Sequence, residues 1–329
     1  MENNNKLLVS YAPHLRGEDS IAKTMGNVVF ALIPALVGAV YFFGFRALIL
    51  TLVTVLSCVL SEYIWDRLTK KENTITDLSA VVTGVLLSFC LPVTLPLYMA
   101  AIGGVFAIII VKMFFGGVGQ NIVNPALAAR AFLLASWPVD MTRFVAPFSR
   151  LSLFGANADV VSGATPLAVV KGAEDAVAAS YTDLFFGNVA GCIGEVSALL
   201  LLIGGAYLLI RRIITPVIPL VYIATVGLFG WMFGGEGLFA GDFIYHILSG
   251  GVILAGFFMA TDYVTSPMTA WGAAVYAFGA GLITGVIRIF GGYPEGATYG
   301  ILVMNIVTPL IDKAIKPRVF GKGRKAVAK

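Results

Sequence analysis

Two short polar stretches interrupt otherwise apolar sequence and carry residue types that could bind a ligand or an ion. The residues concerned are Asn121, Asn124, Pro125 and Arg130 in the first stretch and Thr261 and Asp262 in the second. An asparagine before a proline is typical of a helix N-cap followed by a proline at the first helical position. The free amides and partial positive charge of such a helix start suit an electron-rich or anionic ligand. The two stretches are therefore candidates for a ligand site, with ordinary helix ends at a membrane surface as the alternative.

A third candidate is the run SGATPL at positions 162–167. Thr165 offers a hydroxyl oxygen that can be bonded to phosphorus. Gly163 and Ala164 leave the backbone open to a modifying enzyme, and Pro166 restricts the conformations of the segment. Taken alone, the same run could also be a turn made of small residues.

The composition indicates which kind of chain must position these residues. Of the 329 residues, 58% are hydrophobic and 12% are charged, whereas a soluble domain has roughly 45–50% apolar and about 25% charged residues. Several apolar runs approach the roughly 20 residues that span a bilayer. The three cysteines show no paired spacing, so we expect no metal site. The chain is predicted to be an integral membrane protein in contact with the lipid bilayer, without a nucleic acid partner.

The apolar runs divide the chain into two groups of five predicted helices. The spans are expected at 26–44, 46–65, 78–91, 95–113 and 125–138, and at 188–210, 216–234, 243–260, 270–290 and 297–313. The domain organisation is therefore an N-terminal tail (1–25), a first five-helix unit (26–138), a loop (139–187), a second five-helix unit (188–313) and a basic tail (314–329).

The placement of basic residues predicts the orientation of the chain. With the N-terminus inside, most of the 22 Lys and Arg residues fall on the cytoplasmic side, including those at 67–71, 211–212 and 313–329. Cytoplasmic loops of membrane proteins carry such an excess. Both termini are therefore expected in the cytoplasm, and the 139–187 loop outside.

The two halves share a spacing that suggests an inverted repeat. Leu91-Pro92 is followed by Phe115-Gly116-Gly117, and Ser266-Pro267 is followed by Phe290-Gly291-Gly292, with 24 positions from Leu91 to Phe115 and from Ser266 to Phe290. Inverted repeats with interrupted half-helices often place a binding site near the bilayer midplane. The predicted fold class is an all-α membrane protein of about ten transmembrane helices, arranged as two inverted five-helix repeats with interrupted half-helices.

The motifs also resemble a known family. The run at 162–167, the Ser10-Tyr11-Ala12-Pro13-His14 segment, and the stretches 116–129 and 260–267 are similar to the RnfD/NqrB family of flavin-carrying membrane subunits. The resemblance implies that an extracytoplasmic flavin transferase joins FMN through its phosphate to Thr165, with Ser162, Gly163 and Ala164 around the attachment point. It also implies a non-covalent riboflavin within the subunit. The outward orientation predicted for 139–187 places Thr165 on the side where that transferase acts.

The resemblance implies a function in the cytoplasmic membrane of a bacterium or archaeon. Such a subunit carries electrons between ferredoxin and NAD⁺ in an Rnf complex, coupled to Na⁺ or H⁺ translocation, with RnfA, RnfB, RnfC, RnfE and RnfG as partners. It has no catalytic residue of its own, because the flavin ring performs the redox chemistry. The alternative is a ten-helix solute channel or transporter without a cofactor, with Asn121, Asn124 and Asp262 as binding residues.

Two ionisable residues within or near the spans are open to two interpretations each. Arg130 could contact a flavin or carboxylate, or form a structural pair with Asp262 or Glu62. Glu195 could lie on an ion path or form a hydrogen bond at a subunit interface. Lys112, by contrast, is expected to be an anchor at the inner membrane face.

The predicted orientation can be tested by cysteine labelling. A cysteine introduced at Ala158 should react with a membrane-impermeant thiol reagent from outside, and cysteines at Lys70 and Lys322 only after the membrane is opened. The parent chain, whose Cys58, Cys90 and Cys192 lie in apolar sequence, is the control. Reaction of the Ala158 position only from the cytoplasmic side would invert the topology.

Overall fold

The computed structural model describes residues 20–70, 74–149, 151–153, 163, 165–171, 179–195, 197–235, 237–292 and 295–317. Within these residues the chain forms helices and no strand. Ser162, Ala164 and most of the two tails lie outside the described residues.

The first half of the chain contains long helices joined by short connections. Its elements are α1 (Ile21–Phe43), α2 (Phe45–Thr69), the 3₁₀ turn η1 (Ile75–Asp77), α3 (Ser79–Phe89), α4 (Leu97–Val105), the π-helix η2 (Phe106–Met113), α5 (Pro125–Ser136) and α6 (Pro138–Met141). Helix α1 begins within the predicted tail, because Ser20 caps it by accepting the amide of Lys23 at 3.2 Å.

The second half begins with short elements and continues with long helices. Its elements are α7 (Pro166–Val170), α8 (Tyr181–Phe186), the 3₁₀ turn η3 (Ile193–Glu195), α9 (Ala198–Ile210), α10 (Val217–Phe233), α11 (Phe243–Leu248), α12 (Val252–Leu254), the π-helix η4 (Ala255–Met259), α13 (Ala270–Phe290) and α14 (Ala297–Ala314). The predicted helix at 188–210 forms only from Ala198. The predicted helix at 243–260 is broken at residues 249–251 and continues as a π-helix from Ala255.

Helices lie in all ten predicted ranges, and their outward faces are apolar. By length and composition, α1, α2 and α13 can each cross a membrane, while α3, α4 with η2, α5, α9 and α10 are shorter apolar helices. Large apolar side chains on these outer faces, such as Val37, Leu56 and Phe278, are more than half exposed. Apolar side chains facing outward suit lipid and not water. An all-helical membrane fold is therefore supported, while the number of ten spans stays a prediction.

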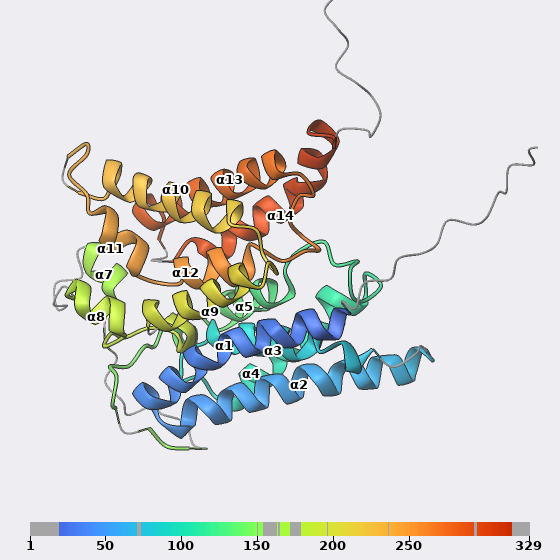
Figure 1. Ribbon diagram of the computed structural model, residues 1–329. Helices are drawn as coiled ribbons and strands as arrows, with labels where there is room; N and C mark the ends of the chain where they lie inside the picture. Colours follow the sequence, from blue (N-terminus) through green and yellow to red (C-terminus); the bar gives the residue numbers. More distant parts are fainter. Residues whose placement is uncertain are drawn as a thin grey trace, which may run out of the picture.

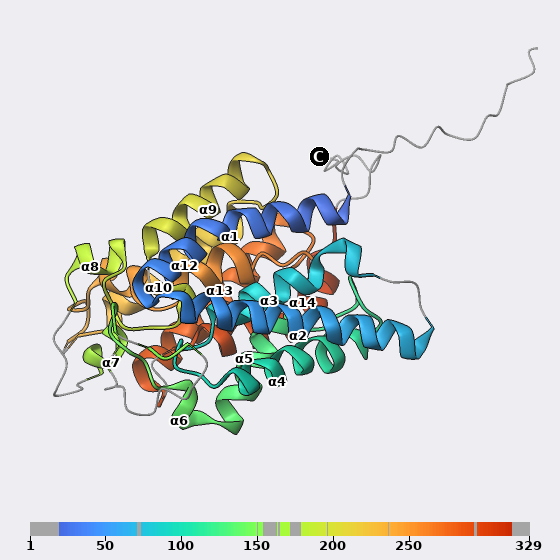
Figure 2. The same ribbon diagram turned by 90° about the horizontal axis from the view of Figure 1, so that it is seen from below.

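The helices run side by side between two ends of the molecule. Helices α7, α8 and α11 gather at one end, whereas α1 begins and α14 finishes at the opposite end (Figures 1 and 2). The two described chain ends thus lie together, as the predicted topology requires of the two termini. Which end faces the cytoplasm stays a prediction.

The two halves have similar internal packing. Helix α2 packs on α3 and α4, and α10 packs correspondingly on α11 and α13. The halves meet where α1 packs against α9 and α5 against α14. This pattern is what two related five-helix units would give, and the inverted relation between them stays a prediction.

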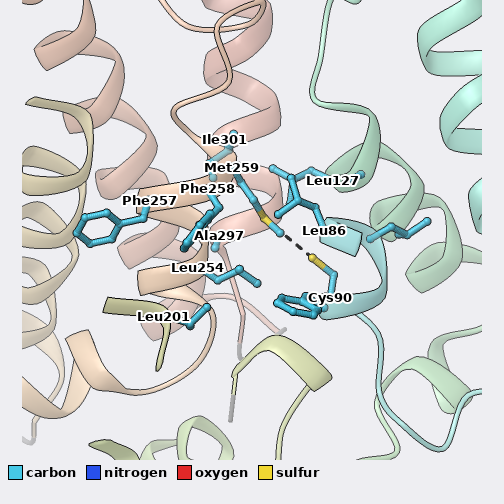
Figure 3. Packing of buried hydrophobic residues seen from close by; sticks show 14 of the residues in the cluster. Leu86, Cys90, Leu127, Leu201, Leu254, Phe257, Phe258, Met259, Ala297 and Ile301 are labelled. Atoms are coloured by element: carbon cyan, nitrogen blue, oxygen red, sulfur yellow. Dashed lines mark hydrogen bonds between the residues drawn. The ribbon is translucent and has the colours of Figure 1, made fainter. Parts of the chain in front are cut away.

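A shared apolar core fills the space between the halves. Side chains from α3, α5, α9, η4 and α14 converge there, and the Cys90 sulfur lies 4.0 Å from the Met259 sulfur at their centre (Figure 3). Cys90 belongs to the first half and Met259 to the second. The core therefore holds together segments that are far apart in sequence.

The connection between α3 and α4 is buried, so its backbone needs hydrogen-bond partners within the protein. Arg46, which is itself buried, donates to the carbonyl oxygens of Val93 at 3.4 Å and Leu95 at 2.8 Å, and also to Leu153 at 2.6 Å. One guanidinium thus satisfies several carbonyls of irregular backbone.

The contact between α1 and α9 depends on Gly204. A Cβ atom at this position would lie 2.1 Å from the carbonyl oxygen of Ala31 in α1. Gly204→Ala is therefore expected to push the helices apart and destabilise the fold by about 1–3 kcal/mol, measured as a lower thermal midpoint in detergent. Gly237→Ala is the matched control, because a Cβ there meets nothing within 4 Å. Equal midpoints for the two variants would contradict this packing.

Candidate functional site

The first interrupted stretch lies between η2 and α5. Gly116 and Gly117 adopt φ values of +123° and +102°, which residues with side chains rarely do, so the chain can turn sharply here. The turn ends at Asn124, whose side-chain oxygen accepts the amides of Ala126 at 3.0 Å and Leu127 at 3.3 Å. Asn124 is therefore the N-cap of α5, as predicted from the asparagine before proline.

The second interrupted stretch follows η4. Its Asp262 carboxylate accepts the amide of Val264 at 3.3 Å and the hydroxyl of Thr265 at 3.2 Å. The Thr261 hydroxyl donates to the carbonyl oxygen of Phe257 at 2.7 Å. These local bonds satisfy a backbone that has left the helix.

The two stretches meet across the interface between the halves. Asn124 donates through its amide nitrogen to the carbonyl oxygen of Met259 at 3.2 Å, at the end of η4. The side chain of Asn121 hydrogen-bonds to the Asp262 carboxylate. Four of the predicted site residues, which come from sequence positions more than a hundred residues apart, are thus brought to one place.

A cavity opens beside this meeting point. Asn121, Asn124, Thr261 and Asp262 all line it, and the volume open to the centre of a water-sized sphere is about 100 Å³. Apolar and aromatic side chains, including Leu86, Phe257 and Phe258, form the rest of its wall. A largely apolar cavity with a few convergent polar groups is the usual form of a cofactor site. Thr24 and Met25 of α1 also line it, which places it toward the end where α1 begins.

Lys112 also lines the cavity, so its expected role as a surface anchor is wrong. The side chain is buried, and its nitrogen lies 2.9 Å and 3.0 Å from the two carboxylate oxygens of Glu62 and 2.6 Å from the hydroxyl of Ser79. A buried ammonium needs such a partner. Sequence reasoning missed this pair because the two residues belong to different helices.

Arg130 was predicted to join this site but does not line the cavity. It contacts the carboxylate of Glu295 and lies 3.8 Å from Glu195 and 3.7 Å from the sulfur of Cys192. Both structural partners expected from the sequence, Asp262 and Glu62, are therefore wrong. Helix α5 carries Arg130 away from its capped end and turns it toward the loop before α14.

The groups around Arg130 form a second buried polar cluster. The ligand-type atoms of Cys192, Glu195 and Glu295 lie within 4.8 Å of one another. Because the guanidinium of Arg130 reaches all three, the positive charge at this place is already supplied by a side chain. We assign the cluster to ion pairing and not to a metal. Glu295 was not among the residues predicted from the sequence.

Thr165 lies at the start of α7. Its hydroxyl oxygen accepts the amide of Ala168 at 3.3 Å, and its side chain is only 5% exposed. The following residues anchor the segment, because Tyr245 donates to the carbonyl oxygen of Pro166 at 3.1 Å and Leu167 is buried. Helix α7 lies at the end of the molecule opposite the start of α1 (Figure 1), and therefore opposite the cavity.

These features define a helical membrane protein that keeps a buried polar cavity between interrupted helices. The chain belongs to the NQR2, RnfD, RnfE family, whose sequence pattern matches residues 8–321. It is 50% identical over 321 residues to the D subunit of the Na(+)-translocating ferredoxin:NAD(+) oxidoreductase complex of Acetobacterium woodii, covering 97% of this chain and 96% of that protein.

Two further relatives cover almost the whole chain. It is 46% identical to the D subunit of the proton-translocating ferredoxin:NAD(+) oxidoreductase complex of Clostridium ljungdahlii, over 97% of this chain and 98% of that protein. It is 38% identical to the D subunit of the ion-translocating oxidoreductase complex of Halorhodospira halophila, over 95% of each chain. The resemblance to the RnfD type inferred from the sequence is confirmed, and the chain belongs to a family of subunits of ion-translocating oxidoreductases.

Proposed function

We propose that this chain is the RnfD-type member of an Rnf complex and carries electrons across the membrane between two flavins. One is FMN bonded to Thr165, and the other is a non-covalent flavin, riboflavin by resemblance, in the cavity at Asn121, Asn124 and Asp262. The complex would couple electron transfer between ferredoxin and NAD⁺ to Na⁺ or H⁺ translocation. The observation that carries the proposal is the position of Thr165 and the cavity at opposite ends of one helical bundle.

Attachment of FMN at Thr165 requires access to a hydroxyl that is buried in the packed segment. The transferase would therefore act before Leu167 and Pro166 pack against the region of α11. The threonine hydroxyl bonds to phosphorus, and the later packing holds the segment in place. Covalent attachment also prevents loss of a soluble cofactor.

The cavity has the side chains that a flavin ring needs. Phe257, Phe258 and Leu86 would contact the flat apolar part of the ring, and the amides of Asn121 and Asn124 would face its polar edge. A bound flavin supplies the one- and two-electron chemistry. Lys112 adds a positive charge at the cavity wall, which favours the reduced, more negative form of a ligand there.

The remaining parts of the proposal rest on the family. RnfA, RnfB, RnfC, RnfE and RnfG would be the partners, and an extracytoplasmic flavin transferase would modify the loop. The chain would lie in the cytoplasmic membrane with both termini inside. The alternative, a solute transporter, would share the interrupted helices, but it would need no modified threonine in the loop.

The attachment site can be tested by in-gel fluorescence of the denatured protein. Thr165→Ala is expected to abolish covalently retained flavin fluorescence, while Thr165→Ser keeps part of it because the hydroxyl remains. Thr182→Ala is the matched control, since Thr182 is an exposed threonine in nearby α8. Full fluorescence of the denatured Thr165→Ala protein would refute the attachment.

The cavity can be tested by the amount of flavin that acid precipitation releases from the purified complex, relative to covalently retained flavin. Loss of one hydrogen bond to a charged or polar partner costs about 1–3 kcal/mol, so Asp262→Asn and Asn124→Ala are expected to weaken retention roughly 5- to 100-fold. Covalent fluorescence should be unchanged. Asp312→Asn, which alters an acid outside the cavity, is the control. An unchanged ratio in both cavity variants would place the second flavin elsewhere.

A further inference from the structure

Glu195 has a carboxylate oxygen that is buried without a hydrogen-bond donor. Its side chain is 4% exposed, and among the described residues no group donates to its Oε1 atom. The nearest cation is Arg130, whose Nη2 atom lies 3.8 Å away and contacts Glu295 instead. An ionised carboxylate in such a place is costly, whereas a protonated one is neutral.

The groups that face Glu195 come from several elements. Arg130 of α5 and Glu295 before α14 form the ion pair beside it, and Cys192 lies on its own turn. Cys90, at the end of α3, lies near Arg130. Arg288 of α13 acts on Glu195 from the other side but points its nitrogens to the carbonyl oxygens of His246 at 2.7 Å and Ser249 at 2.9 Å. Neither arginine is therefore a dedicated partner of Glu195.

A turn of two glycines connects this carboxylate to the segment that carries Thr165. A Cβ atom at Gly251 would lie 2.7 Å from Oε1 of Glu195. A Cβ atom at Gly250 would lie 2.7 Å from Leu167 and 2.8 Å from a nitrogen of Arg288. Ser249, the residue before this turn, has a fully buried hydroxyl that also lacks a partner among the described residues. The break between α11 and α12 thus brings an unpartnered acid close to the Thr165 segment.

We propose that Glu195 is a proton-binding site that is loaded when the flavin on Thr165 is reduced. This inference rests on the proposed function. When an electron arrives, a proton from water adds to Oε1 and forms an O–H bond. When the electron leaves, that bond breaks and the proton is released. The added negative charge raises the proton affinity of a nearby buried carboxylate, because charges interact strongly where water is excluded.

A proton fits this place better than a metal cation does. The guanidinium of Arg130 already occupies the centre of the cluster, within 3.8 Å of Glu195 and 3.7 Å of Cys192. A second cation there would be repelled by this fixed charge and would need a shell of several oxygens. A proton needs one oxygen, and Glu195 offers one that is unused.

The test is a reduced-minus-oxidised infrared difference spectrum of the purified complex. Reduction of the wild-type complex is expected to add a carboxylic-acid C=O band that shifts in D₂O. Glu195→Gln should remove that band completely, whereas Asp140→Asn, which alters an acid in α6, should keep it. Persistence of the band in Glu195→Gln, or its absence from the wild type, would overturn the proposal.

Two further measurements separate this proposal from folding and from the flavin assignment. Glu195→Asp keeps a carboxyl group, so a correctly assembled variant should show a band at a shifted frequency, and an unshifted band would overturn the proposal. Covalent fluorescence and bleaching of the flavin absorbance on reduction are recorded in the same samples. If both are normal and the band ignores Glu195, the proton site fails while the flavin at Thr165 stands. If covalent fluorescence is missing from the wild type, the proposed function itself fails.

Discussion

The amide side chain of Asn124 closes both breaks in the helical bundle. Its oxygen caps α5 and its nitrogen binds the last carbonyl of η4, so one residue satisfies backbone groups from both halves. Lipid offers no hydrogen bonds, and irregular backbone survives at membrane depth only where protein or a cavity supplies them. The cavity exists because the two breaks are held together and their remaining polar groups point into it.

Buried charges in the described residues follow the same constraint. Lys112 is neutralised by Glu62 beside the cavity, and Arg130 by Glu295 further along the bundle. Charges within a membrane protein are retained when they are paired and have a function. These pairs create fixed potentials along the route between the cavity and Thr165. An electron moving between the two ends would pass both.

The sequence allowed much of this arrangement to be predicted, but not the partners of buried charges. Asn124 before Pro125 correctly marked the start of α5, because an N-cap is a local interaction. The resemblance of the loop to a flavin attachment site led to Thr165, although its burial was not visible in the sequence. Arg130 was placed at the cavity and paired with the wrong acids, because its partners depend on how α5 is rotated against η3 and α14. The break at 249–251 was missed for a similar reason, since two glycines within an apolar run do not by themselves end a helix.

Relatives of 50% and 46% identity are named for sodium and for protons respectively. Overall similarity is thus compatible with either ion, and the choice must lie in particular residues or in partner subunits. What the family shares is the electron path, and two flavins at opposite ends of this chain are the central claim. A density map of the purified complex tests it most directly. The account predicts density continuous with the Thr165 hydroxyl oxygen and a second flat density among Asn121, Asn124 and Asp262. A bare Thr165 together with a cavity filled by side chains would contradict it.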